Sequence, residues 1–351
     1  MPHHHIIERI LAHNKNQVRE FNSDAAIAHR FRFRRDHKVC VIVIKCMDGR
    51  VHFAILTDMP LGIVHPFRNL GGVADVGMTT LNLRLKLIIE DARTQDEEIL
   101  FVVTYHYAEG NHQRGCRAFG YDEDRARQNA IGIVRQVQRC LNGVVYPIMI
   151  GLETDRHSLH FHGNPNIDTC CDIGVMLGEH TTTTDMQSAV QTECARLYPS
   201  ASERMSKLLC EFMIGNARHI VKTRPEGRIE TDLEHRECVL AIGEGFDWMH
   251  ILNFALIIGD FTPHLKAAIR AAVDLLEENF RRDQLPGGQA VLFVSVPYGE
   301  DYFRELITER ARRLAQLAAQ VVQSYNPEFA KRFHSLTAVV RRETRQLEIL
   351  E

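Results

Sequence analysis

The chain has 351 residues, of which 45% are hydrophobic and 25% are charged, which is typical of a globular protein of about two domains. Its 42 Lys and Arg residues nearly balance its 45 Asp and Glu residues, so the formal net charge is only −3. No block of basic residues interleaves with aromatic residues, which argues against nucleic acid as a partner. The apolar runs are far shorter than the roughly 20 residues that cross a bilayer, so we expect no membrane partner either.

The N-terminus and the cysteines predict the compartment. Met1 to Glu8 lacks the apolar core and the cleavage site of a signal peptide, and we expect a surface helix there. The nine cysteines are an odd number in a long chain without such a signal, a usage typical of a reducing environment. We therefore expect a cytoplasmic protein in which most thiols are buried and a few bind metal.

Hydrophobic periodicity in the first half predicts alternating strands and helices. Continuous apolar runs rich in β-branched residues are typical of strands buried on both faces of a parallel sheet, and helical spacing separates them. This alternation predicts an α/β fold with a central, mostly parallel sheet flanked by helices. The expected elements are a helical arm over 1–37, strands over 38–45, 99–105, 144–150 and 158–162, and helices over 80–92 and 122–141.

The remainder of the chain divides into a connector and a repeat. Residues 163–230 alternate polar turns with helices expected around 186–197 and 202–221, and we interpret them as a connector and insertion. Residues 231–351 repeat the plan of residues 38–162, which predicts an internal duplication of one α/β unit. The four matched segments are Cys238–Ile242 with Cys40–Ile44, Val291–Ser295 with Ile99–Val103, Glu309–Arg312 with Asp124–Arg127, and Glu343–Ile349 with Glu153–Leu159.

Potential metal ligands follow two of the predicted strands. Cys46 comes directly after the first strand, His106 follows the second, and Cys116 lies ten positions further on. Because the carboxyl ends of parallel strands converge on one crevice, Cys46 and His106 should face the same pocket, and Cys116 can enter it from the loop. Two thiolates and one imidazole that leave a fourth position open are typical of a catalytic zinc site.

At this point the chain resembles the β-class carbonic anhydrases. That family carries a Cys-x-Asp-x-Arg segment, then Arg-Asn-x-Gly, then a His and a Cys. Here the order is Cys46-Met-Asp-Gly-Arg50, Arg68-Asn-Leu-Gly-Gly72, His106 and Cys116, and the resemblance covers roughly residues 38–162. It implies a β-carbonic-anhydrase-like fold and a Zn²⁺ enzyme that reversibly hydrates CO2 to bicarbonate and a proton, with Cys46, His106 and Cys116 as the zinc ligands.

The same resemblance implies roles for Asp48 and Arg50. Asp48 would accept a hydrogen bond from the attacking hydroxide and orient it, and Arg50 would hold the carboxylate by a bidentate contact. If the pair opened, Asp48 could itself take the fourth position on zinc and switch the enzyme off. These two residues are therefore the predicted catalytic pair.

The chain departs from the family pattern at two places. Gly49 stands where the family usually has Ser, and nine residues separate His106 from Cys116 where the family usually has two. A stretched gap, together with an active domain fused to a degenerate copy, is similar to the carboxysomal shell carbonic anhydrases, although carboxysome association is not implied because the chain lacks the length for that group's extra N-terminal domain. His112 is a rival to His106 as ligand, and we favour His106 because it falls at the strand end.

The second unit is expected to bind no zinc. Its counterparts of Cys46, Asp48 and His106 fall at Glu244, at Phe246 and near Tyr298, and none of these makes a zinc set. Since β-class units normally pair, the inactive copy would supply the partner surface within one chain. We also expect a homo-oligomer.

Two other functions remain open at this point. The same zinc site could hydrolyse a related heterocumulene, CS2 or COS, or the chain could be a non-catalytic zinc-binding scaffold or assembly component. The other cysteines and a histidine group are interpreted as structural rather than metal-binding. They are Cys40, Cys140, Cys194, Cys210 and Cys238 in the core, and His157, His160, His162, Cys170 and Cys171 around a turn and a strand.

Overall fold

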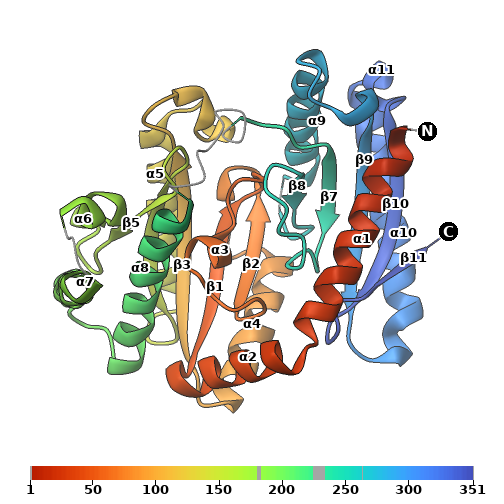
Figure 1. The fold of residues 1–351 in the computed structure, drawn as a ribbon. Coiled ribbons are helices and arrows are strands. Elements are labelled where there is room, and N and C mark those ends of the chain that lie inside the picture. The colour runs from red at the N-terminus through yellow and green to blue at the C-terminus, as the bar shows by residue number, and fades with distance from the viewer. Residues whose placement is uncertain (1, 180–182, 224–233, 263, 351) are drawn as a thin grey trace.

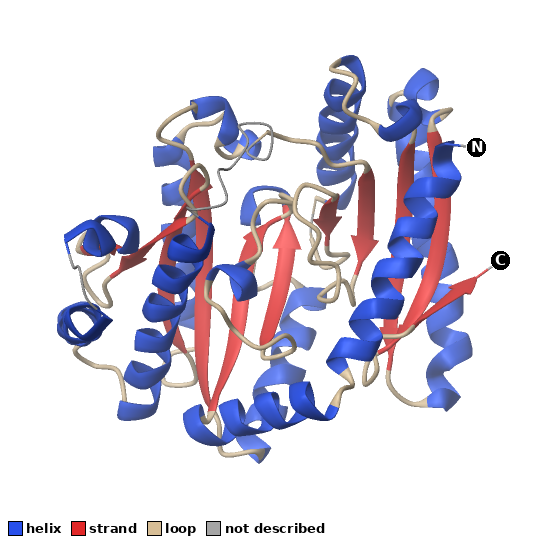
Figure 2. Cartoon of the chain, in the orientation of Figure 1, coloured by secondary structure: helices blue, strands red, loops and turns tan. Residues whose placement is uncertain are grey.

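Two β-sheets lie beside each other, with helices covering their faces (Figures 1 and 2). The computed structural model describes residues 2–179, 183–223, 234–262 and 264–350. Both sheets are mostly parallel, so the predicted α/β class with a mostly parallel sheet is confirmed. Within those ranges, no helix combines the length and the apolar character that a bilayer-spanning segment needs.

The first sheet has the strand order β2-β1-β3-β4-β5-β6. Strands β1 to β4 pair in parallel, and β5 and β6 add antiparallel neighbours at one edge. The strands are β1 Val39–Cys46, β2 Val64–Asn69, β3 Glu98–Tyr107, β4 Tyr146–Glu153, β5 Ser158–His162 and β6 Cys170–Asp172.

The second sheet has the order β11-β10-β9-β7-β8, which repeats the order of the first five strands of the first sheet. In both sheets the first strand in sequence lies between the second and the third, and the last pair is antiparallel. The strands are β7 Val239–Gly243, β8 Ala255–Ile258, β9 Ala290–Tyr298, β10 Phe333–Arg341 and β11 Leu347–Leu350.

Backbone pairing gives the register between the two sheets. Thr154 N donates to Tyr107 O at 2.9 Å, and Arg342 N donates to Tyr298 O at 2.8 Å, so Tyr107 and Tyr298 occupy corresponding positions. In the same register, Pro297 of the second sheet occupies the position that is equivalent to His106 of the first. It also aligns Glu153 with Arg341, so the sequence match between Glu343–Ile349 and Glu153–Leu159 is wrong by two residues.

Helices cover both faces of the first sheet. In β1, Val41 and Val43 pack toward α3 and α8, whereas Ile42 and Ile44 pack in the core that contains α4 and α5. This alternation explains why the strand is apolar throughout. The helices of this half are α3 Phe53–Leu56, α4 Thr79–Thr94, α5 Glu123–Cys140, α6 Ile173–Glu179, α7 Thr183–Leu197 and α8 Glu203–Thr223.

The N-terminal helices are α1 Pro2–Phe21 and α2 Asp24–His37. Helix α1 crosses the second sheet in front of β9 and β10 (Figure 1), where it buries Ile6 and Ile10. The side chain of Asn14 donates to Arg345 O at 2.9 Å and accepts from Leu347 N at 3.2 Å. The opposite face of that sheet is covered by α9 Leu265–Arg281 and α10 Arg304–Tyr325, followed by the short α11 Pro327–Ala330.

The two halves meet where β2 approaches β8. Gly259 N donates to Arg68 O at 2.8 Å, Ile257 N donates to Met47 O at 3.0 Å, and the backbone of Asn253 reaches Gly49 O at 3.2 Å. Apolar residues from both halves also belong to one continuous core. The loops that follow β1 and β2 are therefore held by the second half.

The sequence predicted most of the long elements and missed several short ones. The helical arm and the strands and helices expected up to residue 162 are present, with no bound shifted by more than three residues. Strands β2, β6 and β8 were not expected. Residues 163–223 do more than connect, because β6 extends the first sheet and α8 covers one of its faces. Cys140 was expected in the core, but it lies exposed at the end of α5, and Cys210 is half-buried.

Candidate metal centre

Three potential metal ligands converge at the carboxyl ends of β1 and β3. Cys46 ends β1, His106 lies one residue before the end of β3, and Cys116 precedes the short 3₁₀ turn Arg117–Phe119. Their ligand atoms all lie within 4.8 Å of one another, and all three residues are buried. Parallel strands thus bring together Cys46 and His106, which are 60 positions apart in the sequence, and the loop after β3 adds Cys116.

The chemistry of these side chains fits a zinc ion. Neither ring nitrogen of His106 has a hydrogen-bond partner among the described residues, although its side chain is only 2% exposed. Burying such a group without a partner is costly, and a metal ion would satisfy one nitrogen. A hydrogen bond from the Cys116 thiol lowers the pKa of Cys46 well below its ordinary value, while the same contact and burial raise the pKa of Cys116. Two thiols that share a proton in this way are suited to bind zinc as thiolates.

A compact loop accounts for the long gap between His106 and Cys116. The turn Glu153–Asp155, which follows β4, ties the loop down: Asp155 accepts from Gly110 N at 3.0 Å and Glu153 accepts from Glu109 N at 3.1 Å. Thr154 Oγ1 donates to Tyr107 O and to Arg114 O, which brings the end of the loop back toward its start. His112 is exposed on this loop and does not belong to the cluster, so the geometry favours His106 as the ligand.

Asp48 and Arg50 form a buried bidentate ion pair beside the cluster. Arg50 Nη2 lies 2.6 Å from Asp48 Oδ2, Nε lies 3.0 Å from Oδ1, and the Arg50 backbone N donates to Oδ1 at 2.8 Å. Burial opposes ionisation of Asp48, but the guanidinium of Arg50 and the neighbouring imidazoles outweigh it and hold the pKa of Asp48 well below its ordinary value. His106 Nε2 lies 3.8 Å from Asp48 Oδ2, so the carboxylate faces the metal cluster.

His235 and Glu237 reach this site from the second half, just before β7. Arg50 Nη2 lies 3.0 Å from His235 Nε2, and His235 Nδ1 lies 3.0 Å from Glu237 Oε2. Glu237, which is fully buried, also accepts from Gly49 N at 3.2 Å. These two residues were missed in the sequence, because their only signal is a short His-x-Glu segment far from the motif that they contact.

Gly49 leaves room for Glu237. A Cβ atom at this position would lie 3.0 Å from Ala255 O and 3.0 Å from both Cγ and Oε1 of Glu237. Contacts of that length are tighter than ordinary van der Waals contact. Glycine at this position therefore has a physical reason in this chain, namely the close approach of Glu237.

A second group of potential ligands lies directly behind the first. The ligand atoms of Asp48, His235 and Glu237 also lie within 4.8 Å of one another. The guanidinium of Arg50, however, contacts both Asp48 and His235. A positive group in that position disfavours a second cation, so we assign the metal centre to Cys46, His106 and Cys116.

A small cavity adjoins the cluster and is lined mainly by apolar side chains from both halves. Arg117 on its wall is fixed by Glu278 of α9, with Arg117 Nη2 lying 2.7 Å from Glu278 Oε1. The apolar side chains are Met47, Leu70 and Ala118 from the first half and Leu256 and Leu275 from the second. The space beside Cys46 and His106 thus has a mainly apolar wall.

The Arg68-to-Gly72 segment shapes the loop beside Cys46. Asn69 Nδ2 donates to Thr262 Oγ1 of the second half and to Val73 O, both at 2.7 Å. Gly71 has φ +64°, and a Cβ there would lie 2.7 Å from Ala118 Cβ. Glycine is required at this position both by the left-handed backbone and by the close packing.

At the corresponding place in the second half, an ion-pair network stands where the ligands would be. Glu244, the counterpart of Cys46, pairs with Arg84 of α4. Arg84 Nη2 also lies 2.7 Å from Asp260 Oδ1, and Arg310 binds the second oxygen of Asp260 at 2.5 Å. Burial raises the pKa of Glu244, and the arginines oppose that shift. Guanidinium groups here supply the positive charge that a metal would supply in the first half.

The remaining histidines and cysteines singled out in the sequence lie on other faces. His160 contacts Tyr107 Oη at 2.9 Å and Asp172 Oδ2 at 2.7 Å, and His162 contacts Tyr105 Oη at 2.9 Å. His157 stacks on His219. Cys170 is exposed and Cys171 is buried. Comparison with protein-family models and with the sequences of curated proteins gives no match, so the case for a function rests on the geometry of the site.

Proposed function

We propose that the chain is a zinc-dependent carbonic anhydrase that reversibly hydrates CO2 to bicarbonate and a proton. One observation carries this proposal: the ligand atoms of Cys46, His106 and Cys116 converge within 4.8 Å beside the Asp48–Arg50 ion pair. A closed structural zinc site normally has four protein ligands and no such pair. Three ligands next to an oriented carboxylate are typical of a site that leaves one position for a reacting molecule.

Zinc bound here would lower the pKa of a water molecule from about 15.7 to about 7 and so supply a nucleophile at neutral pH. The protein's own side chains would hold the metal and orient the reacting molecule beside it. Asp48 is kept ionised by Arg50 and acts only as a hydrogen-bond acceptor, which selects one orientation of a donor placed between it and the cluster. Arg50 holds both carboxylate oxygens, and this bidentate contact keeps Asp48 from turning toward the metal ligands.

The cavity beside the cluster suits CO2 as substrate. CO2 is small, linear and uncharged, and the walls that it would meet are formed mainly by apolar side chains such as Met47, Ala118, Leu256 and Leu275, with Arg117 as a charged neighbour. An apolar wall favours a neutral gas over the charged product. This asymmetry supports hydration followed by release of bicarbonate.

The second half would contribute residues to the metal site of the first half and would bind no metal itself. We propose that the two halves arose by duplication, supported by their shared strand order and by the corresponding bonds at Tyr107 and Tyr298. The second half supplies His235 and Glu237 to the metal site, whereas its own corresponding position holds the Glu244–Arg84 ion pair. One functional zinc per chain follows.

An assay with several substrates distinguishes this proposal from its two alternatives, hydrolysis of a heterocumulene and a non-catalytic zinc-binding scaffold. Zinc-loaded protein is assayed with CO2, COS and CS2, alongside Cys46→Ala and the matched variant Cys140→Ala at an exposed thiol. We expect CO2 hydration to exceed turnover of COS and CS2, with Cys46→Ala inactive and Cys140→Ala unchanged. If the protein turned over COS or CS2 faster than CO2, we would assign heterocumulene hydrolysis as the function of the site. Stoichiometric zinc with no turnover of any of the three would support a scaffold instead.

A further inference from the structure

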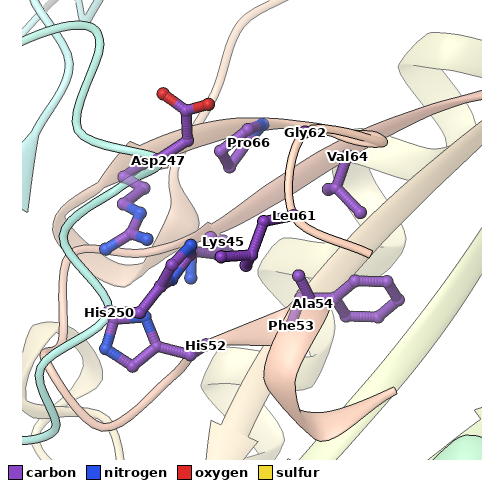
Figure 3. A pocket seen from close by; sticks show the side chains of 11 residues that line it. Lys45, His52, Phe53, Ala54, Leu61, Gly62, Val64, Pro66, Asp247 and His250 are labelled. Carbon is purple, nitrogen blue, oxygen red and sulfur yellow. The ribbon is translucent and has the colours of Figure 1, made fainter. Parts of the chain in front are cut away.

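A second cleft lies on the opposite side of β1 from the metal centre. Successive side chains of a strand point to opposite faces, so Lys45 faces this cleft while Cys46 faces the metal cluster. Arg68 of β2 also lines this cleft. His52 enters from the turn before α3 and His250 from the second half (Figure 3). We call these four residues the cationic cleft.

The side chains on the inner wall of the cationic cleft are buried, and several of their nitrogen atoms lack a hydrogen-bond partner among the described residues. Lys45 is 1% exposed, and His52 and Arg68 are each 5% exposed. Among the described residues, no hydrogen-bond partner is present for either ring nitrogen of His52, for Nη1 of Arg68 or for Nδ1 of His250. Lys45 Nζ also lies on this wall, where it donates to Val51 O. Several buried nitrogen atoms of these side chains thus converge on one space without a hydrogen-bond partner among the described residues.

The charges in the cationic cleft are equally unbalanced. Burial lowers the pKa of Arg68 to about 10, which still leaves it protonated at neutral pH. Among the described residues that line the cleft, Asp247 alone carries a carboxylate, and it is bound by Arg345. Figure 3 shows the carboxylate of Asp247 directed away from Lys45, His52 and His250. Because a buried guanidinium without an anionic partner is costly, an anion beside Arg68 in the cationic cleft would relieve this imbalance.

The outer wall allows a ligand to enter. Ala54, Leu61 and Gly62 on one side, with Asp247 and His250 on the other, are each half-buried rather than buried. The cationic cleft therefore extends from buried donors to the surface between the two halves. Its small size favours a compact ligand over an extended one.

We propose that the cationic cleft binds an oxyanion of the phosphate class. A tetrahedral phosphate carries more than one negative charge near neutral pH and can accept from several N–H groups at once, and a guanidinium matches its geometry. The imidazoles of His52 and His250, whose pKa values burial lowers, act as neutral N–H donors. The source of the phosphate group is either the free inorganic ion or the terminal group of an organic ester.

Calorimetric titration with inorganic phosphate at constant ionic strength tests this proposal. Zinc-loaded and zinc-free protein are compared, because binding to zinc would appear only in the first. We expect saturable binding of similar affinity in both, and weaker binding of chloride. A simple organic phosphomonoester, titrated in parallel, distinguishes the sources: tighter binding than phosphate indicates an ester, and equal or weaker binding indicates the free ion.

Variants locate the site. Arg68→Gln should weaken phosphate binding by about tenfold or more, since a hydrogen bond to a charged group contributes about 1.5–3 kcal/mol. His250→Asn, on a half-buried loop position, should also weaken binding and keeps the test valid if Arg68→Gln fails to fold. Asp247→Asn should tighten binding by removing a nearby negative charge. His37→Asn, at a buried histidine outside the cleft, is the matched control.

Three results would overturn the proposal. They are phosphate binding no tighter than chloride, binding seen only with zinc present, and unchanged affinity in both folded Arg68→Gln and His250→Asn variants. The proposal does not depend on the carbonic anhydrase function. An inactive protein that still binds phosphate in the cationic cleft would disprove one and support the other.

Discussion

The Nη2 atom of Arg50 lies 3.0 Å from Nε2 of His235, a residue 185 positions later in the chain. Arg50 also holds Asp48, and His235 is held in turn by Glu237, so one hydrogen-bonded series connects the two halves. Because the whole series is buried, removing one member leaves its neighbours without partners. This relationship gives the second half a direct role in the site and leads to the following predictions.

Cys46→Ala should lose zinc and CO2 hydration together, because two of three protein ligands do not retain the metal tightly. The matched change in the second half is Glu244→Ala, which removes the corresponding side chain and its ion pair with Arg84. That variant should keep both zinc and activity. Zinc content and hydration rate are measured on the same samples, and loss of zinc only in Glu244→Ala would reverse our assignment of the two halves.

Arg50→Gln should keep zinc and lower kcat. Without the guanidinium, Asp48 loses its bidentate partner and is free to turn toward the metal ligands. Loss of an outer partner of a metal site typically reduces activity by about 10- to 100-fold. Metal analysis and steady-state kinetics check this, and an active Arg50→Gln enzyme with unchanged kcat would show that the ion pair is not needed.

His235→Asn should lower kcat more than it raises KM, because His235 lines the cavity beside the cluster but its polar contacts are with Arg50 and Asp48. We expect a loss of about tenfold, at the lower end for an outer partner. Glu237→Gln, which keeps the shape and the acceptor for Gly49 N, should lose less. An increase in KM alone in His235→Asn would instead place this residue in substrate binding.

Gly49→Ser tests why this chain departs from the usual residue at that position. The added Cβ would lie 3.0 Å from Ala255 O and from two atoms of Glu237, so Glu237 must shift. Overpacking of this kind typically costs about 1–3 kcal/mol of unfolding free energy. We expect a lower midpoint in denaturant and reduced kcat, with zinc retained. A variant as stable and as active as the parent would mean that Glu237 moves at no cost.

His162 gives a prediction for the pH dependence of stability. Burial lowers the pKa of His162 to about 4 in the folded protein, so between pH 6.5 and 4 the unfolded chain binds the extra proton. Stability should therefore fall as the pH falls through this window, by about 3 kcal/mol from this one group. His162→Asn should lose less unfolding free energy between pH 7 and 4 than the parent. The unfolding free energy of both proteins is measured by denaturant titration at pH 7 and pH 4. If the parent and His162→Asn lost the same unfolding free energy between these pH values, His162 would not be the source of the pH dependence.

The sequence predicted the metal cluster because its signal is local. Cys46 and His106 follow apolar strands, and parallel pairing then brings them together. Cys116 could be included because the loop that carries it is only ten residues long. The same reasoning could not find His235 or Glu237, because their position depends on how the second half packs against the loop after β1.

The missed strands have a common cause. Strands β2 and β8 are short and interrupted by polar residues or preceded by irregular loops, so their periodicity is weak. Their place in the fold comes from pairing with β1 and β7 and from the contact between the halves. The cationic cleft could not be predicted from the sequence either, because Lys45 was only a charge next to Cys46 and Arg68 was seen only as part of the Arg68–Gly72 segment.

The measurement that tests the central proposal most directly is stopped-flow CO2 hydration by the purified protein, with zinc determined on the same sample across a range of pH. We predict about one zinc per chain and a hydration rate that rises with pH as expected for a site that lowers the pKa of water to about 7. A protein that carries one zinc per chain and hydrates no CO2 at any pH would contradict it.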